Sequence, residues 1–235
     1  MKSILFQIGT TDAASPADSL QKAVQASQEL NILELSTKGG VIMIPIVILL
    51  AIAIFLIIER WLNIRKAGKS DPYFMANIKD MVINGNISGA RMLCEKNNTP
   101  IARMLEKGIS RIGSNMKNIE VAIDNVGNLE LYKMEKGMPI LATIAGAAPM
   151  IGFLGTVTGM IKTFFELSKQ GDTITAGALG GGIYEAMVTT VAGLIVGLIA
   201  YLGFNLLTAS IERVVYKMEA STVEFIDILQ QPASK

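Results

Sequence analysis

The residues of this chain that could do chemistry are one carboxylate and a few hydroxyls inside long apolar segments. Glu185, Thr189, Gly193 and Gly197 follow one another at intervals of four residues, which places them on one face of a helix. A carboxylate in a membrane-spanning helix is energetically costly and by default indicates a functional site. Beside hydroxyls it could pass protons or bind a cation. Because Glu185 lies at the head of its apolar segment, the alternative is that it only reaches water or lipid headgroups.

A second group of small and polar residues lies in an earlier apolar segment. Gly152, Thr156, Gly159 and Thr163 share one helical face, and Gly155 forms a small-xxx-small pair with Gly159. Small residues let helix backbones approach closely, so this face could serve helix packing alone. It could equally be a polar lining that faces another polar group. The residues of this segment leave both interpretations open.

The residue types that are missing exclude most other chemistry. The chain has no histidine, one cysteine and no G-x-x-x-x-G-K-[ST] nucleotide-binding sequence. We therefore expect no enzyme activity, no metal site and no cofactor. A net charge of +1 gives no field that would draw nucleic acid. One carboxylate near one interface cannot carry charge across a bilayer, so the missing relay should lie on another subunit.

Composition indicates an all-α membrane protein in which three transmembrane helices position these residues. Hydrophobic residues make up 51% of the 235 residues and charged residues 17%, which fits a membrane protein with one modest water-exposed part. A helix needs about 20 apolar residues to cross a bilayer. The segments long enough to do so are 41–58, 138–162 and 183–211. We expect two of these helices to extend into a helical cytoplasmic domain.

Basic residues near the ends of the spans predict the orientation. By the positive-inside rule, the side with more basic residues faces the cytoplasm. Its basic residues are Arg60, Arg65, Lys66, Lys69, Lys133, Lys136, Arg213 and Lys217. The other side has only Lys38, Lys162 and Lys169. The prediction is a periplasmic N-terminal arm, 1–40, and a periplasmic loop, 163–182. The cytoplasmic parts are then a helical domain, 59–137, and a C-terminal helix extension, 212–235. Turn-forming residues divide the helical domain at 71–72, 84–86, 97–100 and 113–115.

Two motifs in the second and third spans resemble those of the MotA/TolQ/ExbB proton-channel family. The first is Ala-Pro-Met-Ile-Gly-Phe-Leu-Gly-Thr-Val-Thr-Gly-Met over 148–160. The second is Glu-Ala-Met-Val-Thr-Thr-Val-Ala-Gly-Leu over 185–194. The pair is specific because both motifs occur in the family's order and topology. The resemblance covers roughly residues 40–230 and, within the family, is greatest to ExbB.

The resemblance implies a homopentamer around a central pore in the bacterial inner membrane. The pore would hold helices of an ExbD-like partner, whose single span carries a membrane aspartate as the proton carrier. Proton flow would drive a motion passed to a TonB-like energy transducer, which energises TonB-dependent outer-membrane transport. The family's threonines that match Thr156 and Thr190 line the pore, and the glutamate that matches Glu185 is functionally important.

Alternatives to an ExbB-like motor subunit stay open at this point. They are a TolQ-like subunit of a Tol-Pal envelope-maintenance motor, a passive scaffold in the lipid bilayer, and a stand-alone cation channel. Ile199 stands where the family often has a proline, so a kink in the third span is in question. Helical spacing pairs Thr189 with Glu185, whereas the resemblance favours Thr190 as the lining residue. In a pentamer one face can line the pore while another meets the neighbouring subunit.

Overall fold

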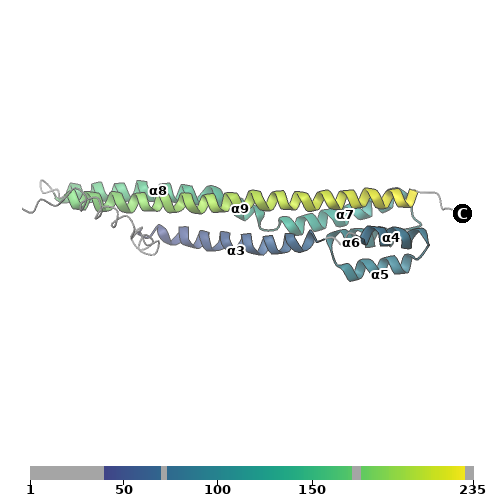
Figure 1. Cartoon of the computed structure of the whole chain (residues 1–235). Helices are drawn as coiled ribbons and strands as arrows, with labels where there is room; N and C mark the ends of the chain where they lie inside the picture. The colour runs from purple at the N-terminus through teal and green to yellow at the C-terminus, as the bar shows by residue number, and fades with distance from the viewer. Residues whose placement is uncertain (1–39, 70–72, 171–175, 231–235) are drawn as a thin grey trace, which may run out of the picture.

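The computed structural model describes residues 40–69, 73–170 and 176–230, and these residues form only helices and turns (Figure 1). The helices are α3 (Met43–Ala67), α4 (Phe74–Ile83), α5 (Ile87–Asn97), α6 (Pro100–Ile109), α7 (Met116–Glu135), α8 (Met138–Gln170) and α9 (Ala176–Gln230). The prediction of an all-α protein is confirmed. The N-terminal arm up to residue 39 and the predicted turn at 71–72 lie outside the described residues.

Within the described residues, three stretches of helix are long and apolar enough to cross a membrane: Met43–Ala67, Met116–Lys169 and Gly180–Gln230. Each overlaps one of the three expected spans. α9 has 55 residues, so it is about 80 Å long, whereas a bilayer core is about 30 Å thick. Figure 1 shows α9 running the length of the molecule, with α8 beside one part and α7 beside the other. α9 passes through Ile199 as one continuous helix, because no proline interrupts its hydrogen bonds.

The segment 163–182, expected as a loop, is mostly helical. α8 continues to Gln170, and α9 already begins at Ala176. The glycine-rich stretch 177–182, which falls within this predicted loop, forms the first turns of α9. Contact between the two helices favours this extension, since Thr163 is buried and its side chain lies against Gly182. Packing against a neighbouring helix thus outweighs the low helix propensity of glycine.

Turn residues separate α4, α5, α6 and α7 at the breaks expected within the described part of 59–137. The side chains of Asn86 and Thr99 accept hydrogen bonds from backbone N–H groups of the first turns of α5 and α6. Pro100 then occupies the first turn of α6, where its missing N–H costs least. Gly113, with a φ of 95°, lets the chain turn toward α7.

The apolar core of these shorter helices lies where α6, α7 and α9 meet. Leu105 and Ile123 are fully buried there, and so is Phe225 near the end of α9. A Cβ atom at Gly108 would contact both Ile123 and Phe225, so the absence of a side chain lets α6 approach them. The far end of α9 is therefore anchored in the helical domain by a large aromatic side chain.

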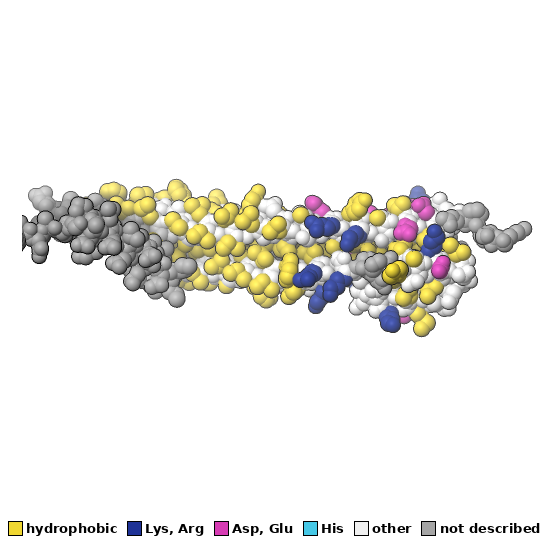
Figure 2. Space-filling model, viewed as in Figure 1, with side chains coloured by type: hydrophobic (Ala, Val, Ile, Leu, Met, Phe, Trp, Pro, Cys, Tyr) yellow, Lys and Arg dark blue, Asp and Glu magenta, His cyan; other side chains and the backbone are white. Residues whose placement is uncertain are grey.

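The surface divides along the long axis of the molecule. Figure 2 shows hydrophobic side chains covering the part formed by α3, α8 and the first half of α9, with Lys and Arg gathering where that surface ends. Exposed apolar side chains of this part include Phe55, Phe164 and Leu198. Apolar side chains exposed over such an area fit a lipid environment, so the chain is a multi-pass membrane protein.

Candidate functional site

Helices α8 and α9 pack antiparallel through a ladder of small residues. A Cβ atom added at Gly193 would lie 2.6 Å from the carbonyl oxygen of Ala148 and 2.9 Å from Cα of Gly152, so the two backbones nearly touch. Other steps of the ladder place Gly197 against Pro149, Gly155 against Thr189 and Gly159 against Ala186. Small residues permit this close approach, and close packing holds membrane helices together where lipid removes the hydrophobic drive.

The structure brings most of the small residues singled out from the sequence into this ladder. Gly152, Gly155, Gly159, Gly193 and Gly197 all lie against the opposite helix. Of the two interpretations left open, helix packing describes these five positions. In a single chain they leave no lumen, because backbone and side-chain atoms of the facing helix fill the space.

Thr189 belongs to the packed face and is 2% exposed. Its hydroxyl donates to the carbonyl oxygen of Ala186 on its own helix at 2.7 Å, and the carbonyl oxygen of Gly152 lies at 3.5 Å. A buried hydroxyl satisfied in this way stabilises the helix pair. Thr189 therefore has no free side to offer to a pore or to a neighbouring chain.

Thr190 and Thr156 lie at the edge of the same contact and are half-buried. The Thr190 hydroxyl donates across the helix pair to the carbonyl oxygen of Gly152 at 3.0 Å. That carbonyl is also the helical hydrogen-bond acceptor for the backbone N–H of Thr156, four residues later. The Thr156 hydroxyl donates to the carbonyl oxygen of Phe153 at 2.7 Å. The two threonines consequently lie at the same level of the helix pair, each with part of its side chain accessible.

Glu185 lies apart from both threonines. It precedes Thr190 by five residues, which is about 7.5 Å along the helix axis. Its carboxylate lies against Gly40, in the turn before α3, where a Cβ atom would collide with a carboxylate oxygen. The expected face that joins Glu185 to Thr189 is therefore divided, because Thr189 points to α8 and the Glu185 carboxylate to the start of α3.

This arrangement can position hydroxyls at one level of an apolar helix pair, but a single chain offers no continuous path across the membrane. Within the described residues, no group of three or more Cys, Asp or Glu side chains could hold a metal ion. The contact provides hydroxyl donors and acceptors, and any titrating group at the level of Thr156 must come from outside this helix pair.

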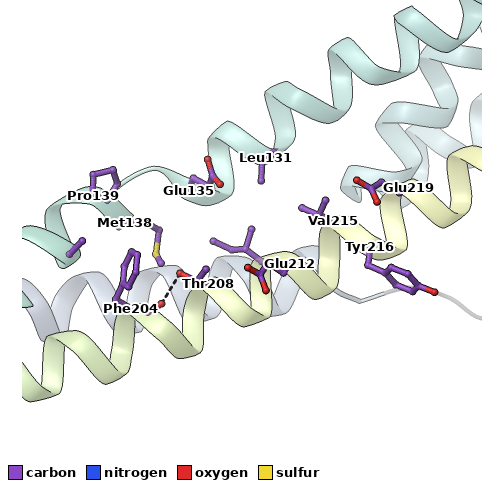
Figure 3. Close-up of a pocket in the computed structure, with 12 residues that line it drawn as sticks. Leu131, Glu135, Met138, Pro139, Phe204, Thr208, Glu212, Val215, Tyr216 and Glu219 are labelled. Atoms are coloured by element: carbon purple, nitrogen blue, oxygen red, sulfur yellow. Dashed lines mark hydrogen bonds between the residues drawn. The ribbon is translucent and has the colours of Figure 1, made fainter.

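A cavity that sequence patterns did not reveal opens where α7 and α8 diverge from α9 (Figure 3). Its volume is about 640 Å³. Leu131, Glu135 and Met138 form one wall, facing Phe204 and Glu212 of α9 (Figure 3). On α9, the lining residues follow one another at helical spacing from Phe204 to Glu219. On the other side, the chain turns between α7 and α8 at Gly137, which has a φ of 87°. This turn sets α7 at an angle to α8 and leaves the cavity open.

An ion-pair network lies in the helical domain, outside the membrane part. Burial alone would raise the pKa of the Glu130 carboxyl group. Hydrogen bonds from Arg103, at 2.5 Å, and from Lys133, at 2.7 Å, outweigh burial and hold this pKa below its ordinary value. The network therefore joins α6 to α7. It belongs to the helical domain and not to the contact between α8 and α9 that holds both threonines.

Comparison with known proteins gives a consistent set of relatives. Residues 96–220 match the model of the MotA/TolQ/ExbB proton channel family. The chain is 30% identical over 186 residues to a putative biopolymer transport protein ExbB-like 1 of Synechocystis, covering 78% of this chain and 73% of the relative. A putative biopolymer transport protein ExbB homolog of Methanothermobacter thermautotrophicus is 28% identical, covering 80% of this chain and 67% of the relative.

A relative with another name covers the chain even more fully. The Tol-Pal system protein TolQ of Haemophilus influenzae is 26% identical over 220 residues, which is 87% of this chain and 96% of the relative. The matched region of the family model includes α8 and the membrane half of α9, with all the threonines and glycines of the helix contact.

Proposed function

Because this chain belongs to the MotA/TolQ/ExbB proton channel family, we propose that it is the channel subunit of an inner-membrane motor driven by the proton motive force. The observation that supports this most is the placement of Thr156 and Thr190. Both are half-buried at one level of an apolar helix pair, with part of each side chain accessible. Hydroxyls in that position can hydrogen-bond a titrating carboxyl group of another helix.

The titrating group in this proposal comes from a partner. The partner is an ExbD-like protein with a single span and a membrane aspartate, held in the pore of a homopentamer of this chain. The partly accessible hydroxyls of Thr156 and Thr190 at the edge of the α8–α9 contact support such an assembly, since polar side chains can hydrogen-bond a further membrane helix packed there. Glu185, near the periplasmic end, would serve proton entry or exit.

The output of the motor is proposed to be an ExbB-like one, in which a TonB-like transducer energises outer-membrane transport. The ExbB-type names of the two relatives with 30% and 28% identity favour this output. A TolQ-like output is the second candidate, because the TolQ relative matches over 96% of its own length. In both cases the N-terminus is periplasmic and the C-terminus cytoplasmic, following the excess of basic residues at one set of span ends.

The experiment that tests the channel role removes the two hydroxyls. Thr156→Val and Thr190→Val, each expressed with the partner, should lower proton flux across membrane vesicles by about tenfold, the effect of losing one hydrogen bond of about 1.4 kcal/mol. Thr158→Val is the matched control, since Thr158 is exposed on the same helix and its hydroxyl donates to its own helix. Normal flux in both variants would favour a passive scaffold.

Two further measurements test the role of Glu185 and the alternative of a stand-alone channel. Glu185→Ala should abolish energised transport while the oligomer still assembles, and Glu166→Ala, exposed on α8, is its control. The chain reconstituted without a partner should conduct no protons, because its helix contact holds no titrating group. Proton conduction by the chain alone would instead identify a stand-alone channel.

A further inference from the structure

A cleft of about 290 Å³ lies between α3 and α9, where both helices leave the apolar part of the molecule. Its described walls carry four cations and no carboxylate. Arg65 and Lys69 come from the end of α3, while Arg213 and Lys217 come from α9. Chain segments about 150 residues apart thus bring four positive charges to one small space.

The four cations lie together in one cleft without a carboxylate among its described lining residues. Arg60, Arg91 and Arg103 each form an ion pair with a glutamate. Within the described residues, no ion pair is formed by any of the four cations in the cleft. The Arg65 guanidinium lies 5.2 Å from the centre of the Trp61 ring, and Lys217 Nζ lies 3.5 Å from the carbonyl oxygen of Gly68. Uncompensated like charges held together favour binding of an anion.

The position of the cleft identifies the kind of anion. Figure 2 shows Lys and Arg side chains gathered where the hydrophobic surface ends. Trp61, which is half exposed, borders the cleft, as an aromatic residue at the headgroup level of a membrane does. On the membrane side of the cleft, exposed Ile58 and Leu206 continue the apolar surface of the same two helices. An occupant with a negative head and apolar chains would contact both parts.

We propose that the cleft between α3 and α9 binds the headgroup of an anionic phospholipid in the cytoplasmic leaflet. The phosphate lies among Arg65, Lys69, Arg213 and Lys217, and the acyl chains lie on the apolar surface above. Basic pockets between transmembrane helices on the cytoplasmic side are known to suit such headgroups. The bound lipid bridges α3 to α9 and so stabilises the position of α3. The binding does not depend on which motor the chain serves.

Thermal stability and lipid binding of the full chain in neutral detergent test this proposal. Phosphatidylglycerol, phosphatidylcholine and inorganic phosphate are added separately to the wild type and to Arg65→Gln/Arg213→Gln. Phosphatidylglycerol should raise the wild-type Tm, and the double variant should bind it about tenfold or more weakly, given a contribution of about 1 kcal/mol per basic residue. The matched control is Lys79→Gln/Lys107→Gln, which removes two exposed cations elsewhere and should bind as the wild type does.

Each contrary result has a defined meaning. Equal effects of phosphatidylglycerol and phosphatidylcholine would overturn the proposal, as would unchanged binding by the double variant. Equal stabilisation by inorganic phosphate would reassign the cleft to a soluble anion. If Arg65→Gln/Arg213→Gln does not fold, Lys69→Gln/Lys217→Gln removes the same charge from the same cleft, and its phosphatidylglycerol affinity decides the question.

Discussion

The two ends of α9 pack against their neighbours by opposite means. In the membrane half, Gly193 lets the backbone of α9 nearly touch that of α8. In the half packed against the helical domain, Phe225 fills the space between α9, α6 and α7 with a large buried ring. The difference follows from the solvent. Water drives large apolar side chains into a core, whereas lipid gives no such drive and close backbone packing replaces it.

The largest expected effect tests the half of α9 packed against the helical domain. Phe225→Ala should destabilise the helical domain by about 3–5 kcal/mol, because it leaves a cavity where α6, α7 and α9 meet. Amide hydrogen exchange in α6 and α7 measures the loss locally. Val223→Ala, an exposed position on the same helix, should change exchange by less than about 0.5 kcal/mol. Similar effects of the two variants would contradict the anchoring role of Phe225.

A smaller effect is expected when a single methyl group is added to the membrane half. Gly193→Ala should lower stability by about 1–3 kcal/mol, because the new Cβ atom would meet backbone atoms of α8 that cannot yield. The thermal midpoint in detergent measures it. Gly146→Ala is the matched control, since a Cβ atom there has no neighbour within 4 Å and alanine favours the helix by about 1 kcal/mol. Equal midpoints in the two variants would refute close packing at Gly193.

The smallest effect concerns charge in the helical domain. With the pKa of Glu130 lowered in the folded protein, its stabilising contribution is fully present above the ordinary carboxyl pKa and is lost as the pH falls through the lowered value. Glu130→Gln should lower the free energy of unfolding by about 1 kcal/mol near neutral pH. The effect is small because Lys133 is exposed, so that solvent screens its ion pair with Glu130. At strongly acidic pH the carboxyl group is protonated, and the substitution should change nothing. Denaturant unfolding as a function of pH measures this, and a pH-independent difference would contradict it.

Sequence alone predicted the membrane helices and most helix breaks, because hydropathy over about 20 residues and turn residues are local signals. Residue spacing alone could not show which of the neighbouring residues Thr189 and Thr190 is buried in the helix contact. Spacing by four residues joins Glu185 to Thr189, but only the antiparallel register of α8 against α9 shows that Thr189 is buried and Thr190 stays at the edge. Residue spacing shows which residues share a face of a helix, but it does not show which other part of the protein that face packs against.

The same limit explains what was missed. Arg65 and Arg213 were counted among basic residues that set orientation, yet their proximity depends on how α3 packs on α9. The helical extensions over 163–170 and 176–182 were missed for a similar reason. Glycines there predict a turn by propensity, and the partner helix reverses that preference.

The unbroken length of α9 has a mechanical consequence. α9 continues for 55 residues without an internal proline, so no missing backbone N–H interrupts its hydrogen bonds and one end is connected to the other by a single helix. Over about 80 Å, a tilt of about 5° at one end becomes a sideways displacement of about 7 Å at the other. A tilt of α9 at the level of Thr190 would therefore displace the segment around Phe225 sideways, without a separate transmitting element.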